Sequence, residues 1–234
     1  MTQPAERSDR SSSLLEGFSH EPLRERVADV LRAAIFDGAL PPGAPLIEKA
    51  IAADLDISRA PVREAIRVLS QEGLVESVAY KGSSVRRPTS RDVNEVYALR
   101  GLFERFAVRR ILANPDGLED RLRGLVAACD EMNACASAGD LKGLSAADER
   151  FHRNLIALAE NDLLAAMWSL IALRARHIMG LRNAQLRDFP RVAANHRAIV
   201  DALTANDLSL ALELVTAHVE AGAQLALDDW QGQA

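Results

Sequence analysis

The chain has 234 residues, 48% of them hydrophobic and 26% charged, which is typical of a folded globular protein and excludes wholesale disorder. A mean hydropathy of −0.05, with no apolar run as long as a bilayer is thick, excludes a membrane-spanning protein. The net charge of −5 argues against general binding to nucleic acid, and two cysteines are too few for a disulfide framework.

Residues 1–18 are polar, mixed in charge and without hydrophobic periodicity, which predicts a flexible arm. The start of this arm lacks the apolar core of a secretory signal. A cytoplasmic location is therefore expected.

The next segment, residues 19–88, combines helical and strand-like patterns. Helical spacing of apolar residues predicts three helices, at about 22–40, 47–55 and 59–72. Two short strands are predicted after them, at 74–77 and 83–86, joined through Gly82. Three helices followed by a hairpin are the plan of a winged helix-turn-helix.

Residues 89–230 contain only helical patterns after the boundary at Pro88-Thr89-Ser90, where Ser90 is the expected N-cap. This predicts an all-α bundle of about six helices, so the whole chain is expected to be mostly α. The predicted helices lie at about 90–113, 116–138, 140–160, 162–187, 190–205 and 207–228.

The helix expected at 59–72 has two different faces. Val62, Ile66 and Leu69 form an apolar stripe, whereas arginines recur every four residues on the outer face, at Arg59, Arg63 and Arg67. The surrounding segment, 57–91, carries a local net charge of +4. Ser58 is expected to cap this helix. A basic helix of this kind suits the major groove of DNA, although a solvated arginine face is the alternative.

A second pattern concerns histidines on the apolar faces of three predicted helices. Asp148 and His152 are four residues apart on one helix, and His196 and His218 lie on the inward faces of two later helices. One carboxylate and three imidazoles are costly to bury singly but suit a divalent cation, with zinc, nickel or manganese as candidates. The alternative is that each histidine is an ordinary core residue. His20 and His177 fit no such pattern.

Arg100 lies in the middle of an apolar stripe on the helix expected at 90–113. Its position allows two interpretations. Either its stem lies along the apolar surface and its charged end reaches water, or its guanidinium group is a ligand for an anion. Met167 and Trp168, further along the chain, are expected in the core.

The runs LIEKAIA at 46–52, SRAPVREA at 58–65 and EGLV at 72–75, with Gly82, resemble the N-terminal domain of GntR-family transcriptional regulators. The resemblance implies a homodimer that binds a palindromic operator in double-stranded DNA. By motif match, Arg59 and Arg63 would contact bases or phosphates, Lys49 the backbone or a base, Ser58 a phosphate, and Gly82 the minor groove. Asp56 replaces the usual glycine of the turn, which requires a left-handed backbone that Asp tolerates, and Ala60 replaces a common threonine.

Residues 92–225 resemble the FCD domain of the FadR subfamily, through the Asp-x3-His motif at 148–152 and the two later histidines. The resemblance implies a metal held by Asp148, His152, His196 and His218. It also implies that Arg100, in the Leu-Arg pair at 99–100, faces a pocket for a small carboxylate or hydroxy-acid effector. Arg174 is a weaker candidate for the lining of that pocket.

These observations predict a ligand-responsive transcriptional regulator, usually a repressor, and not an enzyme. A first alternative keeps the regulator but makes the metal purely structural. A second is a metal-dependent hydrolase with a DNA-binding appendage. The hydrolase is disfavoured because the chain lacks the helix-borne glutamate base of the His-Glu-x-x-His type and shows no Ser/His/Asp or Cys/His pattern.

Overall fold

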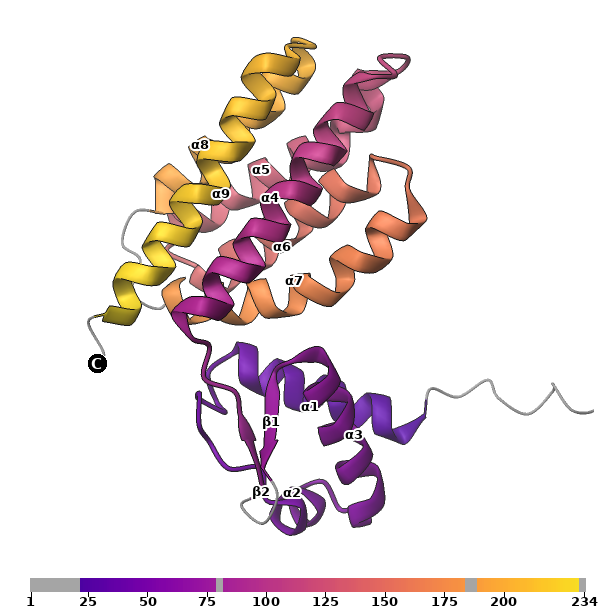
Figure 1. Ribbon diagram of the computed structural model, residues 1–234, viewed down its shortest axis with the longest axis vertical. Coiled ribbons are helices and arrows are strands. Elements are labelled where there is room, and N and C mark those ends of the chain that lie inside the picture. Colours follow the sequence, from indigo (N-terminus) through magenta and orange to yellow (C-terminus); the bar gives the residue numbers. More distant parts are fainter. Residues whose placement is uncertain (1–21, 79–81, 184–188, 232–234) are drawn as a thin grey trace, which may run out of the picture.

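The computed structural model describes residues 22–78, 82–183 and 189–231 (Figure 1). The first part of the chain forms three helices and a hairpin, as predicted. They are α1 (Leu23–Phe36), α2 (Glu48–Asp54), α3 (Arg59–Glu72), β1 (Val75–Val78) and β2 (Gly82–Val85). The arm expected at residues 1–18 lies outside the described residues.

The rest of the described chain is helical, in agreement with the predicted bundle. Its helices are α4 (Ser90–Leu112), α5 (Leu118–Ala138), α6 (Leu141–Ala157), α7 (Asp162–Asn183), α8 (Phe189–Thr204) and α9 (Leu208–Gln231). Within the residues described, no helix is both long enough and apolar enough to span a bilayer.

The winged helix-turn-helix has its own core, built on the apolar face of α3. Val62, Ala65 and Leu69 are fully buried there, together with residues of α1, β1 and β2. Asp56 has a φ of 51°, so the turn before α3 adopts the left-handed conformation that its position requires. The sequence pattern of α3 therefore folds as expected, with its apolar stripe inward.

The wing is an antiparallel pair of strands in which Val75 pairs with Val85 and Val78 with Gly82. Val75 and Val85 both face the core, because side chains at directly opposite positions point to the same side of a sheet. A bridge between Pro45 and Ser84 attaches the hairpin to the segment before α2. The turn at 79–81 lies outside the described residues.

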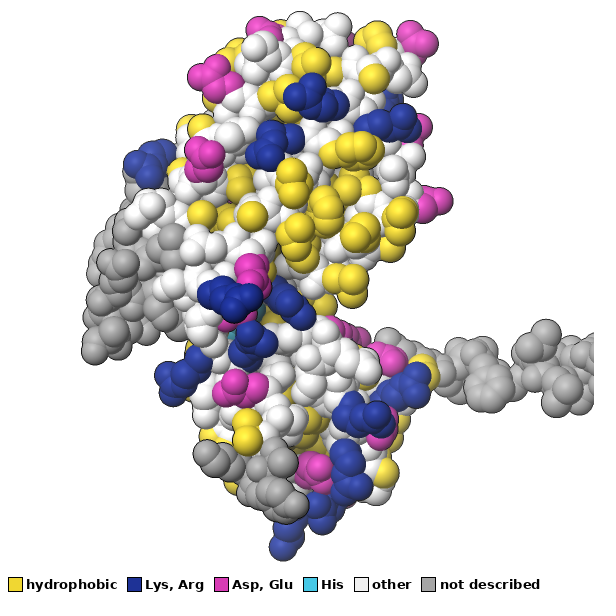
Figure 2. Space-filling view, in the orientation of Figure 1, with side chains coloured by type: hydrophobic (Ala, Val, Ile, Leu, Met, Phe, Trp, Pro, Cys, Tyr) yellow, Lys and Arg dark blue, Asp and Glu magenta, His cyan; other side chains and the backbone are white. Residues whose placement is uncertain are grey.

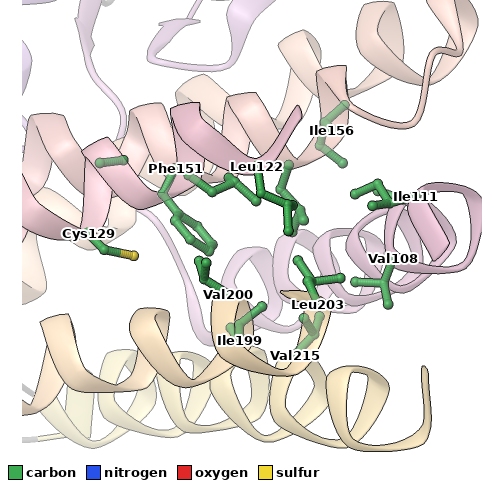
Figure 3. Close-up of a cluster of buried hydrophobic side chains, with 14 of the residues drawn as sticks. Val108, Ile111, Leu122, Cys129, Phe151, Ile156, Ile199, Val200, Leu203 and Val215 are labelled. Carbon is green, nitrogen blue, oxygen red and sulfur yellow. The ribbon is translucent and has the colours of Figure 1, made fainter. Parts of the chain in front are cut away.

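The bundle encloses a larger core to which all six of its helices, α4 to α9, contribute; part of it is seen in Figure 3. Phe151 and Leu155 of α6 are fully buried against Ile199 and Leu203 of α8. A smaller cluster lies where α4, α7 and α9 meet, around Tyr97. The two clusters fix the relative positions of the helices that carry the predicted site residues.

Thr89, and not Ser90, is the N-cap of α4. Its side chain accepts a hydrogen bond from the Asp92 backbone N–H, and the Asp92 carboxylate accepts one from the Thr89 N–H, so the two form a capping box. Arg86 also pairs with Asp92, at 2.5 Å. Both residues are acceptable caps, and the reciprocal bond with Asp92 is available only to a cap three residues before it.

Helix α7 lies at the base of the bundle, where it packs against α1 and α3 (Figure 1). Arg174 Nε donates to the backbone carbonyl of Glu72 at the end of α3, over 3.1 Å. The Arg176 guanidinium lies 4.3 Å from the ring centroid of Phe36 on α1. The buried His177 ring donates from Nε2 to the Arg86 carbonyl, over 3.0 Å. Three residues within one turn of α7 thus contact α1, α3 and the end of the wing.

Gly73 ends α3 in the left-handed conformation, with a φ of 78°, and a side chain there would meet the Arg174 guanidinium. Gly38 has a similar φ of 77° but no neighbour within 4 Å of the position of a Cβ. We expect Gly38→Ala to cost about 1 kcal/mol of unfolding free energy through backbone strain alone. Gly73→Ala should cost roughly 1 kcal/mol more, because it also displaces Arg174 from the Glu72 carbonyl.

Urea unfolding of the two variants measures this difference. In an Arg174→Ala background the two glycine substitutions should become equally costly, because the extra contact is already absent. Equal costs in the wild-type background would show that Arg174 does not hold the end of α3.

Candidate functional site

The arginines of α3 project from the end of the winged helix-turn-helix that is remote from the bundle, where Lys and Arg side chains gather in Figure 2. The side chains of Arg59, Arg63 and Arg67 are 59%, 58% and 68% exposed. The basic stripe is therefore directed to the outside and is not covered by the bundle.

A carboxylate from α2 holds two of these arginines in place. Glu48 Oε2 accepts from Arg59 at 3.0 Å, and Arg63 forms two parallel bonds to the same carboxylate, at 3.1 Å each. The hydrogen bond from Arg63 lowers the pKa of Glu48, so the carboxylate stays ionised. Sequence reasoning assigned no role to Glu48, although its place on the preceding helix of the motif is a usable signal.

The other residues predicted to contact DNA lie around the same end. Lys49 of α2 is exposed, and Gly82 begins β2 with a φ of 88°, opposite Val78. Ser58 occupies the N-cap position of α3, but its side chain makes no capping hydrogen bond, contrary to expectation. Its exposed hydroxyl is consequently not used by the helix.

Inside the bundle, the structure brings together the four residues predicted to hold a metal. Asp148 and His152 come from α6, His196 from α8 and His218 from α9. Asp148, His152 and His196 are at most 4% exposed, and His218 is partly buried. The spacing of Asp148 and His152 by one helical turn places both on the inward face of α6.

The three imidazoles present Nε2 atoms to one another. The His152 Nε2 lies 3.2 Å from the His196 Nε2 and 3.3 Å from the His218 Nε2. The ligand atoms of all three residues lie within 4.8 Å of one another. Two nitrogens bound to the same zinc ion at 2.0–2.1 Å are about 3.4 Å apart in a tetrahedral site, so these separations match a coordination shell.

The orientation of His196 is fixed from behind. Its Nδ1 lies 2.7 Å from the carbonyl oxygen of Val192, and because a carbonyl only accepts, Nδ1 donates. In the neutral ring, Nε2 then carries a lone pair that faces the His152 Nε2 and the Asp148 carboxylate. Positive charge among these groups is needed to relieve their repulsion.

Asp148 completes the cluster. Its Oδ1 lies 3.1 Å from the His196 Nε2, and its Oδ2 lies 3.9 Å from the His152 Nε2 and has no hydrogen-bond partner although it is buried. Burial alone would raise the pKa of Asp148, but the neighbouring His196, His152 and Arg100 side chains hold it well below its usual value. An ionised carboxylate with a buried oxygen lacking a hydrogen bond fits a metal ligand.

Arg100 of α4 turns its guanidinium inward and is 2% exposed, so its charged end does not reach water. Nη2 lies 2.5 Å from the His152 Nε2 and 3.3 Å from the His218 Nε2, while Nε donates to Glu104 at 2.6 Å. Nη1 contacts the sulfur of Met179 on α7 at 3.3 Å. The first interpretation of Arg100, with its charged end in water, is therefore wrong, and the guanidinium is an inward cationic group.

The buried ionic groups of this cluster are one cation, Arg100, and two anions, Glu104 and Asp148. With neutral imidazoles the cluster therefore carries a net negative charge. Burial and the charge of Arg100 both lower the pKa of His152, while Glu104 opposes them, so His152 is neutral near pH 7. An added divalent cation would change the net charge of the cluster from −1 to +1, and the donor set suits zinc, nickel or manganese.

Three residues have positions that the sequence pattern did not predict. Arg174 was suggested as part of the lining of the effector pocket, but it contacts the end of α3 instead. Met167 is 47% exposed, whereas Trp168 is buried as expected. Glu104 has no exposed surface and belongs to the cluster, and its i, i+4 spacing from Arg100 was the available signal.

Comparisons with known families place both halves of the chain. Residues 23–85 match the model described as bacterial regulatory proteins, gntR family, and residues 95–221 match the FCD domain. A relative from Paenarthrobacter nicotinovorans, named for a D-xylose utilization operon transcriptional repressor, is 36% identical and covers 84% of this chain and 85% of the relative. A gluconate operon transcriptional repressor from Bacillus subtilis is 25% identical, over 89% and 86%.

A solved structure gives the same result. The crystal structure of a GntR transcriptional regulator from Rhodococcus sp. RHA1 is 30% identical, covers 88% of this chain and 97% of its own, and superposes with a TM-score of 0.77. The likeness spans both the winged helix-turn-helix and the bundle.

Proposed function

Because the chain belongs to the GntR family and carries an FCD domain, we propose that it is a repressor whose bundle binds a divalent cation and a small carboxylate. That it is a DNA-binding regulator of transcription, and not an enzyme, follows from the family and its relatives. In this proposal residues 19–88 bind DNA, residues 89–230 form the metal and effector domain of a FadR-subfamily member, and the protein acts in the cytoplasm.

The DNA contacts in this proposal come from α2, α3 and the wing. The exposed arginines of α3, with Lys49, Ser58 and Gly82 around them, would reach the bases and phosphates of one half-site. Arginine can donate two hydrogen bonds to a guanine edge, which makes Arg59 and Arg63 the candidates for sequence recognition, with Arg67 beside them. The outward direction of the basic stripe is the observation that carries this part of the proposal.

We expect Arg63→Ala to weaken binding to a DNA duplex selected from a random library by roughly 1–3 kcal/mol, because a bidentate contact is lost. Fluorescence anisotropy against the selected duplex and against an unrelated one measures the change. Arg123→Ala on α5 is the control, since it removes another exposed arginine paired with a neighbouring carboxylate. Unchanged affinity of Arg63→Ala would contradict a role for α3 in recognition.

The metal proposal is supported by the convergence of the three Nε2 atoms and by the buried oxygen of Asp148 that lacks a hydrogen-bond partner. His152, His196, His218 and Asp148 would hold the ion, with zinc favoured and nickel or manganese as alternatives. When bound, the metal would supply a Lewis-acidic position that can accept an oxygen of a ligand. Arg100, at the same cluster, would add a second positive charge for a carboxylate.

The chemistry of a relative suggests the probe for this site. One relative is named for a gluconate operon, and gluconate is a small hydroxy acid. Another is named for a D-xylose operon, and D-xylose is a neutral sugar. Comparing gluconate with D-xylose therefore distinguishes recognition of a carboxylate from recognition of hydroxyl groups alone.

We expect zinc-loaded protein to bind gluconate but not D-xylose in isothermal titration calorimetry. Binding should be lost after treatment with a chelator and in His152→Ala, which should also lose the metal in elemental analysis. If chelation lowers only the melting temperature and leaves gluconate affinity unchanged, the metal is purely structural. Full metal stoichiometry in His152→Ala would contradict the coordination model. Binding of D-xylose but not of gluconate would contradict recognition of the effector through its carboxylate.

A homodimer, which a palindromic operator requires, has a candidate surface on α4 and α7. Figure 2 shows apolar side chains gathered on one face of the bundle. Their spacing of three or four residues places each set on one side of its helix, and the two helices are in contact. The residues of this apolar face, all more than 40% exposed, are Leu99, Leu102, Phe106, Leu163, Met167 and Leu170. We propose that a second copy covers this apolar face through a two-fold axis.

We expect Leu170→Glu to weaken dimerisation by about a hundredfold or more, because a carboxylate would be buried in an apolar contact. Sedimentation velocity over a concentration series measures the change. Leu210→Glu is the control, because Leu210 is also an exposed leucine but lies on α9 outside the apolar face. A dimer of wild-type affinity in Leu170→Glu would exclude this face as the interface.

A further inference from the structure

Glu104 is a fully buried carboxylate in the histidine cluster to which no role has yet been assigned. Its Oε1 accepts from Arg100 Nε at 2.6 Å and lies 3.1 Å from the Nδ1 of His152. Both neighbours belong to the proposed metal and effector site. An ionised carboxylate in such a place costs free energy unless both contacts compensate it.

Glu104 does not contact the side of His152 that would bind a metal. It faces Nδ1, whereas the nitrogens of His196 and His218 converge on Nε2. Because Nδ1 and Nε2 lie on different edges of the imidazole ring, the carboxylate stands behind the ring. Its place is that of a group that orients a ligand, not of a ligand itself.

The contact with Glu104 selects one tautomer of the neutral His152 ring. The Nδ1 of His152 is buried without a regular hydrogen bond, and the nearest carboxylate oxygen, Glu104 Oε1 at 3.1 Å, would repel a bare lone pair there. The proton therefore belongs on Nδ1, in agreement with the donation of Arg100 Nη2 to Nε2. Nε2 is then bare and directed at the other histidines. We propose that Glu104 is a positioning residue of the metal centre, which holds His152 in its metal-binding tautomer and anchors Arg100 beside it. This inference rests on the proposed metal site.

The second action of Glu104 concerns Arg100. Anchored at Nε, the guanidinium places Nη2 2.5 Å from the His152 Nε2 and 3.3 Å from that of His218. A metal ion bound by these nitrogens would occupy the same space and carry the same sign of charge. Entry of the metal therefore requires Nη2 to leave the histidines, and the released group becomes available to a carboxylate.

The two residues should therefore affect metal binding in opposite directions. Zinc affinity, measured by competition with a chromophoric chelator, should fall about 10–100-fold in Glu104→Gln, the range typical for loss of a group behind a ligand. In Arg100→Met it should rise, because the competing cation is removed. A purely structural role for the Arg100–Glu104 pair predicts instead that both variants bind zinc more weakly.

Glu149→Gln is the matched control, since it makes the same substitution on α6, in an ion pair with Arg176 that does not contact the histidines. Its zinc affinity should equal that of the wild type. Wild-type zinc affinity in a folded Glu104→Gln would overturn the proposal.

The tautomer is tested without metal. The ring nitrogen chemical shifts of metal-free wild-type protein, assigned with His152→Ala, should show His152 protonated at Nδ1. Protonation at Nε2 would overturn the inference whether or not the Glu104 variant folds. If the wild type binds no zinc, or binds it independently of His152, the metal site itself fails. The nitrogen shifts of metal-free Glu104→Gln, in which Arg100 remains, then decide the role of Glu104: an unchanged tautomer population of His152 would overturn it.

Discussion

Inside the bundle, mutual repulsion among the lone pairs of three imidazoles and a carboxylate is the constraint on which the remaining features depend. Helices α6, α8 and α9 bring these groups to contact distance, and α4 adds Arg100 and Glu104. Such a cluster is stable only when positive charge enters it, from Arg100, from a proton or from a metal. A core that requires a cation is a core whose conformation can respond to one.

Helix α7 connects this cluster to the DNA-reading part of the chain. Met179 contacts Arg100, and only a few residues earlier Arg174 and His177 hold the end of α3 and the end of the wing. The boundary segment Pro88-Thr89-Ser90 contains the Thr89 cap of α4 and lies close to the contact between His177 and the Arg86 carbonyl. A movement at this junction must therefore break the contacts of α7 or carry α7 with it.

Local patterns accounted for the elements and for the four residues of the histidine cluster. Amphipathic spacing is set within one helix, so the inward faces of Val62 on α3 and of His152 on α6 could be predicted without knowing their partners. Partner identity across helices could not be predicted in this way. The place of Glu104 beside Arg100 and His152 depends on the packing of α4 on α6. Arg174 was predicted to line the effector pocket but contacts the end of α3, because the packing of α7 on α3 decides where that side chain goes.

The pairing of Glu48 with Arg59 and Arg63 has a consequence for the search along a chromosome. Every duplex that engages these guanidinium groups must first replace an existing charged contact, so Glu48 is a resident competitor of DNA. Phosphates of arbitrary sequence gain less from the exchange than they would from unpaired arginines. A guanine edge accepts two directional hydrogen bonds from one arginine, and this gain is available only on the target sequence. Competition from Glu48 therefore shortens the dwell time on unrelated sequence more than on the target.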